Sequence, residues 1–281
     1  MRTLRALWGS SHPGPTLVVT ALAFALGLAI GLPPWRLALL TLAVFAGQLS
    51  VGISNDAVDA PRDRAVGRSD KPLARGDASV RAAWIAASVA LAAALALSAP
   101  LGWRMLAAHA LTLGSAWAYN VGLKSTAWSI APFLVSFGVF PSLATLSAEP
   151  PAFAAGWAWI AGAALGAAVH LTNVLPDLSD DARTGVRGLP HRLGARASAV
   201  VAALAVATGA LAVLLGAAGG ELAAVAPVSW VFFAAVVVVA GATAWLVATR
   251  PPSRMLFRLV MLAALLLAAQ LVVSGGMLAG R

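Results

Sequence analysis

The sequence predicts an all-α protein, a polytopic membrane helical bundle with nine transmembrane helices around a central cavity. Three observations predict it. Of 281 residues, 60% are hydrophobic and only 10% are charged, whereas soluble domains carry about 25% charged residues. Apolar runs long enough to cross a bilayer recur along the whole chain. The basic residues gather in alternate loops between these runs. We therefore expect residues 1–281 to form a single transmembrane domain.

Each predicted helix is an uncharged run bounded by charges, proline pairs or glycine clusters. A spanning helix needs about 20 mostly apolar residues, and about 17 can suffice. Nine runs meet this requirement approximately, the fourth being the shortest: Pro15–Leu32, Leu37–Asn55, Val80–Ala99, Met105–Tyr119, Trp128–Ser147, Phe153–Asn173, Ala197–Ala217, Pro227–Ala248 and Leu256–Leu278.

Positive charge is divided unequally between the two sides of this nine-span topology. The N-terminus and the loops after spans two, four, six and eight hold 16 of the 19 basic residues; only Arg36, Arg104 and Arg281 lie on the other side. Loops rich in Lys and Arg stay in the cytoplasm. We therefore predict an integral, multi-pass membrane protein with a cytoplasmic N-terminus. Membrane topology also explains the net charge of +9 without a nucleic-acid partner.

The acidic residues are few and clustered. Eight of ten lie in two segments, NDAVDAPRDRAVGRSDKPLARGD after span two and NVLPDLSDDARTG after span six. Both segments lie on the predicted cytoplasmic side, so the active site is expected there. The chain has no cysteine, which excludes disulfides and thiolate metal sites.

The two acidic segments share one spacing. Asn55, Asp59 and Asp63 read N-x-x-x-D-x-x-x-D, and the same pattern recurs in the second segment as Asn173, Asp177 and Asp181. A basic, proline-containing turn follows each: residues 71–76 in the first half and 187–194 in the second. The pattern indicates an internal duplication in which each half contributes one helix end to a shared site.

Helix geometry explains why this spacing matters. Steps of four residues advance about 40° around a helix and about 6 Å along it, so each triplet forms a stripe on one face. Pro61 leaves two alternatives for Asp63, either on the helix or on a bent extension beyond it. Facing groups of oxygen ligands suit Mg²⁺, and neighbouring Arg and Lys would complete a diphosphate clamp. The competing interpretation is a solvated, aspartate-rich loop.

The acidic segments carry a family resemblance. NDAVDAPRD resembles the first aspartate-rich motif of the UbiA superfamily of intramembrane prenyltransferases, and LPDLSDDARTG resembles the second. The resemblance covers essentially the whole chain and implies a cavity that opens to lipid. It implies that Mg²⁺ ions hold an isoprenyl diphosphate, one bound by Asn55, Asp59 and Asp63 and the other by Asp177 and Asp181.

Further site residues follow from the same resemblance. Asn173 occupies a position usually polar or acidic in the family, and both asparagines are expected near the diphosphate. Asp56 and Asp180 are expected behind the metal ligands or linked to them through water. Basic residues of the two cytoplasmic loops would steady the departing diphosphate, the best candidates being Arg68, Lys71 and Arg192.

A third family element pairs a tyrosine with a lysine after span four. Tyr119 and Lys124 are the candidates, with a spacing one residue longer than the common Tyr-x-x-x-Lys. Lys124 is expected to contact the diphosphate, while Tyr119 is either a site residue or an interfacial anchor. Four aromatic residues flank this loop and are candidates for the cavity wall: Trp117, Trp128, Phe133 and Phe137. Gln48 and the segment Ser11–Pro13 are further candidates.

The predicted function is Mg²⁺-dependent transfer of an isoprenyl group from a prenyl diphosphate to an aromatic or other lipophilic acceptor within the membrane lipid. One alternative is a membrane terpene cyclase of the same fold, which would use the prenyl diphosphate alone. Less favoured is a cation-coupled transporter, because transporters place such acids near the midplane. A CDP-alcohol phosphotransferase would need acids that the second segment lacks. Acceptor and chain length stay open.

Overall fold

The structure, a computed structural model, describes residues 1–173, 187–250 and 254–279. These residues are almost entirely helical and contain no strand beyond one isolated β-bridge between Ala154 and Ala279, so the all-α prediction is confirmed. The α-helices, in chain order, are α1 Arg2–Ser10, α2 Pro13–Ala29, α3 Pro34–Ala65, α4 Val80–Ser98, α5 Trp103–Val121, α6 Ala131–Leu146, α7 Gly156–Asn173, α9 Leu189–Gly216, α10 Pro227–Thr249 and α11 Arg254–Val273.

Within the described residues, each of the nine predicted runs coincides with one helix from α2 onward. By length and composition, five of these described helices can cross a membrane as single segments, α3, α4, α9, α10 and α11; α1 and α2 would make a sixth if counted as one bent span. α6 is apolar but shorter. Several apolar helices are therefore present, and the count of nine spans stays a prediction.

Helix α1 was not among the predicted elements. It meets α2 at a 65° bend, where His12 adopts the left-handed conformation with φ of 54°. A Cβ at Gly52 on α3 would overlap the carbonyl group of Ser11, so only glycine permits this close approach. The bend is thus held against α3, which places His12 beside Asp56 of that helix, 3.0 Å away.

Helix α3 continues through Pro61 to Ala65. Of the two alternatives for Asp63, the bent extension is therefore wrong, and Asp63 lies on the helix itself. Pro61 has no N–H to donate to the carbonyl four residues earlier, yet the helix continues for four more residues, to Ala65. α9 also differs from expectation: it begins at Leu189, within the predicted turn, and is interrupted at Gly194, whose φ is 76°.

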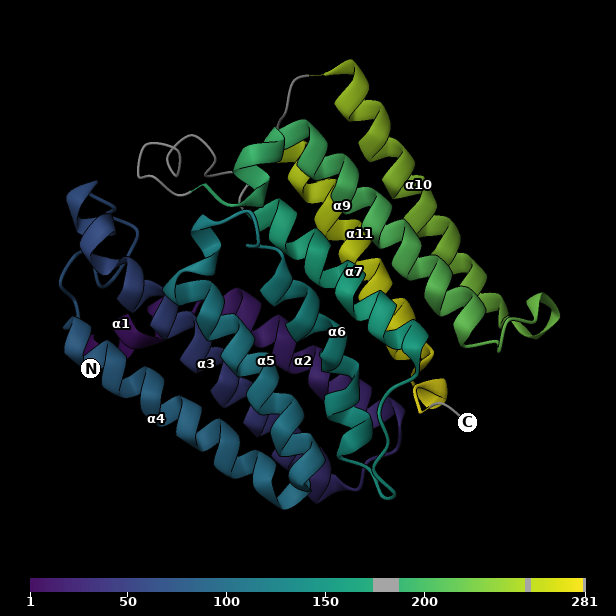
Figure 1. The fold of residues 1–281 in the computed structure, drawn as a ribbon, viewed down its shortest axis with the longest axis horizontal. Helices are drawn as coiled ribbons and strands as arrows, with labels where there is room; N and C mark the ends of the chain where they lie inside the picture. Colours follow the sequence, from purple (N-terminus) through teal and green to yellow (C-terminus); the bar gives the residue numbers. More distant parts are fainter. Residues whose placement is uncertain (174–186, 251–253, 280–281) are drawn as a thin grey trace.

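The helices form a closed ring of packed neighbours, and α4 and α10 lie at opposite edges of the bundle in Figure 1. α2 packs on α3, α3 on α5, α5 on α6, α6 on α7, α7 on α11, and α11 returns to α2. α4 lies outside α3 and α5, and α10 lies outside α9 and α11. α6 and α7 approach most closely through Gly162 and Gly166, because a Cβ at either would overlap a backbone carbonyl of α6. This close contact fixes the position of α6, and with it the aromatic residues that α6 carries.

Candidate active site

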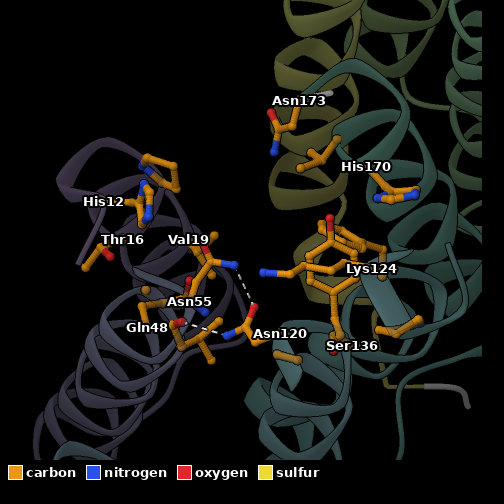
Figure 2. A pocket seen from close by; sticks show the side chains of 18 of the residues that line it. His12, Thr16, Val19, Gln48, Asn55, Asn120, Lys124, Ser136, His170 and Asn173 are labelled. Carbon is orange, nitrogen blue, oxygen red and sulfur yellow. Dashed lines mark hydrogen bonds between the residues drawn. The ribbon is translucent and has the colours of Figure 1, made fainter. Parts of the chain in front are cut away.

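A cavity of about 520 Å³ lies inside the ring. It is lined by α2, α3, α5, α6, α7, the turn after α5 and the first residues of α9. Charged and amide side chains from α3 and from the turn after α5 face one part of it, and aromatic residues of α5 and α6 line another (Figure 2).

The α3 wall carries the predicted triplet. Asn55, Asp59 and Asp63 all line the cavity from successive turns. Asp63 is 3% exposed, and Arg62 lies 3.5 Å from Asp59 and 3.7 Å from Asp63. Like charges one turn apart repel each other, so this stripe needs nearby cations in order to stay ionised.

Lys124 supplies one cation from the opposite wall. It lies in the 3₁₀ turn Leu123–Ser125 after α5, and its Nζ donates to Oδ1 of Asp59. Its side chain points across the cavity towards α3 (Figure 2) and is 12% exposed. Two elements far apart in sequence thereby meet at one carboxylate.

Gly188 holds this turn in place from behind. A Cβ there would lie 2.6 Å from the Lys124 carbonyl oxygen and 2.9 Å from Oγ of Ser129. Ser129 accepts a hydrogen bond from the backbone N–H of Leu189 at 2.8 Å and shares another with Nε2 of His170 at 3.0 Å. The start of α9 therefore packs against the segment that carries Lys124 and Ser129.

Asp56 faces away from the cavity. It is 2% exposed, and its Oδ1 lies 3.0 Å from Nε2 of His12 and accepts from Nζ of Lys71 at 2.7 Å. His12 and Lys71 themselves line the cavity. Asp56 therefore acts behind the triplet in the structure, orienting two cavity-lining groups.

Arg68 lines the cavity while donating two hydrogen bonds of 2.8 Å to Asp70. The side-chain hydrogen bond from Arg68 lowers the pKa of Asp70 to about 2. Asp70 is therefore ionised at neutral pH and steadies the guanidinium at the cavity rim.

The second acidic segment is only partly described. Asp177, Asp180 and Asp181 lie outside the described residues, whereas Asn173, at the end of α7, lines the cavity. Arg192 does not line it: its side chain is exposed and donates to the Arg187 carbonyl at 3.2 Å. His191, its neighbour, is the cavity-lining residue instead.

An aromatic wall faces the α3 stripe. Tyr119 packs edge-on against Phe133 and His170, with ring centroids 5.0 and 5.8 Å apart, and Phe133 stacks with Phe137. All four line the cavity. The location of Tyr119 favours a site role over that of an interfacial anchor.

The two tryptophan candidates for the wall were wrong. Trp117 packs on Trp84 and donates to Oγ of Ser50 at 3.1 Å, and Trp128 is 73% exposed. Gln48, also a candidate, does line the cavity. Among the polar cavity residues that sequence reasoning missed are Arg62, Asn120 and His191. Each is a single polar residue next to a flagged one, so no spacing pattern distinguishes it.

The donor set of the α3 wall suits a divalent cation. Its groups are all oxygen donors, which Mg²⁺ prefers, and a lysine ammonium already contacts one of them. Within the described residues, no three acidic or histidine side chains converge into a metal site. Mg²⁺ usually takes one or two carboxylates and completes its shell with water and substrate phosphate, so the residues fit a shared site.

A bundle of apolar helices thus surrounds a cavity with carboxylates and lysine at one part and aromatic rings at another. Residues 16–266 match the UbiA prenyltransferase family, and the chain belongs to that family. Among curated proteins, none matches the sequence.

Solved structures share the fold. A UbiA homologue from Archaeoglobus fulgidus, bound to DMAPP and Mg²⁺, has a TM-score of 0.72 at 17% identity, covering 96% of this chain and 99% of that one. The apo UbiA homologue from Aeropyrum pernix K1 has a TM-score of 0.72 at 18% identity, covering 92% and 98%. A digeranylgeranylglyceryl phosphate synthase structure has 0.69 at 13%, covering 99% and 100%. At these identities the likeness establishes the fold.

Proposed function

We propose that this protein transfers an isoprenyl group from a prenyl diphosphate to a lipophilic acceptor in the membrane, with Mg²⁺ as cofactor. One observation carries the proposal: Asn55, Asp59 and Asp63 share a cavity with Lys124 and Lys71, and an aromatic wall faces them. Such a cavity suits a substrate with an anionic head and an apolar chain. Relatives solved with GPP or DMAPP and Mg²⁺ support it.

Each wall has a distinct task in this proposal. Lys124, Lys71 and Arg68 bind the diphosphate and hold it as the C–O bond breaks and the electron pair leaves with it. Tyr119, Phe133 and Phe137 exclude water and turn their rings to the allylic cation. The acceptor then forms the new bond to that carbon and releases a proton.

The metal site remains part of the proposal. Asn55, Asp59 and Asp63 would hold one Mg²⁺, and Asp177 and Asp181, outside the described residues, would hold another, with Asn173 and Asp180 beside them. When bound, the cation neutralises charge on the diphosphate oxygens. Asp56 would act indirectly, through Lys71 and His12. Arg192, which is exposed and does not line the cavity, would act as a surface cation that attracts the diphosphate towards it.

The topology also belongs to the proposal. Nine spans in one domain, a cytoplasmic N-terminus and a duplicated aspartate motif would place the charged part of the cavity towards the cytoplasm. Proteins of the same fold provide the support for a membrane location, and the distribution of arginine and lysine provides the support for the orientation.

The reaction is tested with purified protein in lipid nanodiscs and radiolabelled geranyl diphosphate. With Mg²⁺ and a membrane lipid extract as the source of acceptor, we expect a prenylated lipid, and EDTA should abolish it. Without an acceptor, no cyclised hydrocarbon should form. Cyclised product from geranyl diphosphate alone would establish the cyclase instead, and EDTA-resistant transfer would contradict the metal site.

Replacing Lys124 with methionine is expected to weaken geranyl diphosphate binding about tenfold to hundredfold, since a charged hydrogen bond contributes about 1.5–3 kcal/mol. Mn²⁺ binding without diphosphate should not weaken, because the substitution removes a cation that competes for Asp59. Isothermal titration with each ligand checks both. Lys124→Arg should retain part of the affinity, and equal diphosphate affinity in Lys124→Met and wild type would contradict the assignment.

The absence of cysteine permits a direct topology test. Ser69→Cys lies between α3 and α4, Glu221→Cys lies between α9 and α10, and both positions are exposed. In intact cells, a membrane-impermeant maleimide should label position 221 and should label position 69 only after permeabilisation. The reverse pattern would invert the proposed orientation.

A further inference from the structure

Asn120, at the end of α5, connects that helix to Asn55 in the Asn55–Asp59–Asp63 stripe of α3 (Figure 2). It is 2% exposed. Its Nδ2 donates to the Val51 carbonyl and to Oγ of Ser54, each at 2.9 Å. Its Oδ1 accepts from Nδ2 of Asn55 at 3.1 Å. Every side-chain atom of Asn120 that can hydrogen-bond is therefore committed to α3.

The direction of this chain of hydrogen bonds follows from chemistry. The two ends of an amide side chain are nearly identical in shape, so their assignment depends on the partners. The Val51 carbonyl can only accept, so the Asn120 nitrogen must face it. The Asn120 oxygen then faces Asn55, which must answer with its own nitrogen. A backbone group thus determines the orientation of two successive side chains.

The consequence for Asn55 is chemical. One of the two N–H groups of Asn55 donates to Asn120, and within the described residues the Asn55 Oδ1 has no hydrogen-bond partner. An amide oxygen can bind a cation, whereas it cannot donate to a diphosphate oxygen. Asn55 was expected to serve both ligands; the hydrogen-bond direction fixes its oxygen for the cation and leaves its second N–H for the diphosphate.

We propose that Asn120 is a positioning residue that holds the oxygen of Asn55 towards the cavity for a divalent cation. This inference rests on the proposed function. Without Asn120, the Asn55 amide could rotate and present its N–H₂ group, which repels a cation. Residues that orient a metal ligand typically change metal affinity about 10–100-fold when removed.

The first measurement is Mn²⁺ affinity, read from the electron paramagnetic resonance signal of free Mn²⁺ with an inert thiolo analogue of geranyl diphosphate present. Asn120→Leu should weaken Mn²⁺ binding about tenfold or more. Ser50→Ala is the matched control, because it removes the Trp117–Ser50 hydrogen bond, which also joins α5 to α3, at residues that do not line the cavity. It should remain within about twofold of wild type.

A double substitution separates positioning from helix packing. Aspartate at position 55 offers an oxygen in either orientation, so in an Asn55→Asp background Asn120→Leu should not weaken Mn²⁺ binding. Equal weakening in both backgrounds would overturn the positioning role and leave only packing. If Asn120→Leu fails to fold, Asn120→Ala removes the same three hydrogen bonds with a smaller side chain and should weaken Mn²⁺ binding in the same way; affinity within about twofold of wild type would overturn the inference.

The same data distinguish two failures. Wild-type protein that binds no Mn²⁺ in the presence of the analogue would contradict the proposed function itself. Wild-type binding that is lost in Asn55→Ala and unchanged in Asn120→Leu would overturn the positioning inference alone.

Discussion

Replacing Asp59 with alanine is expected to reduce turnover of geranyl diphosphate about 10²–10³-fold or more. Asp59 is the carboxylate at which the walls meet, since it contacts Lys124 from across the cavity and Arg62 from its own helix. The substitution removes a proposed cation ligand and leaves Lys124 without its partner. Losing one group that stabilises developing charge costs about this much, and both initial rate and Mn²⁺ affinity should fall.

The control for this substitution is Asp77→Ala. Asp77 also pairs with two cations, Arg2 and Arg75, and its pKa is lowered by hydrogen bonds from them, yet it does not line the cavity. Its loss should leave turnover within about twofold of wild type. Unchanged prenyl transfer by Asp59→Ala would refute the proposed metal site.

Replacing Gly162 with valine is expected to give the largest loss of stability. Its Cβ would overlap the Phe137 carbonyl and lie 3.3 Å from the Cα of Gly138, so α7 would have to move away from α6. Forcing extra atoms into a packed contact costs about 1–3 kcal/mol and sometimes more. For a chain of this size that corresponds to about 5–10 °C in apparent Tm, measured by tryptophan fluorescence during heating in detergent.

Gly241→Val provides the comparison. Gly241 is also a helical glycine, in α10, but no atom of a packed neighbouring element lies within 4 Å of the Cβ position. It should shift the apparent Tm by about 2 °C or less. Equal shifts for the two variants would mean that the α6–α7 contact is not the tight point of the bundle. Because Phe133 and Phe137 stand on this contact, Gly162→Val should also lower turnover.

The helical elements were predictable because the length of each apolar run and the unequal distribution of basic residues between loops can be read directly from the sequence. Spacing also sufficed for Asn55, Asp59 and Asp63, since residues four apart share a helix face whatever surrounds them. α1 and the persistence of α3 through Pro61 were not predictable in the same way. The position of α1 depends on contacts with other elements, and the Gly52–Ser11 approach is one of them, whereas a proline near a helix end allows either outcome.

Side-chain direction in short segments was the weakest part of the prediction. Arg192 and Trp128 had residue types and sequence neighbours suited to the cavity. The Arg192 side chain is exposed, however, and Trp128 is 73% exposed. His191 lines the cavity in place of Arg192. Arg192 lies in the short part of α9 before the break at Gly194, and Trp128 lies in a turn, so neither segment is long enough for a periodic pattern to predict which way a side chain points.

Residue types and spacing alone indicate a membrane bundle with its lysines and arginines mostly on one side, an acidic stripe on one helix, and the resemblance to a protein family. They suffice because helix periodicity and the transfer of apolar side chains from water are local properties. Tertiary structure decided which groups meet. Lys124 contacts Asp59, which lies 65 positions away in the sequence. Asn120 of α5 hydrogen-bonds both the Val51 carbonyl and the Asn55 amide of α3. Such contacts depend on how helices pack, and packing is a property of the whole ring.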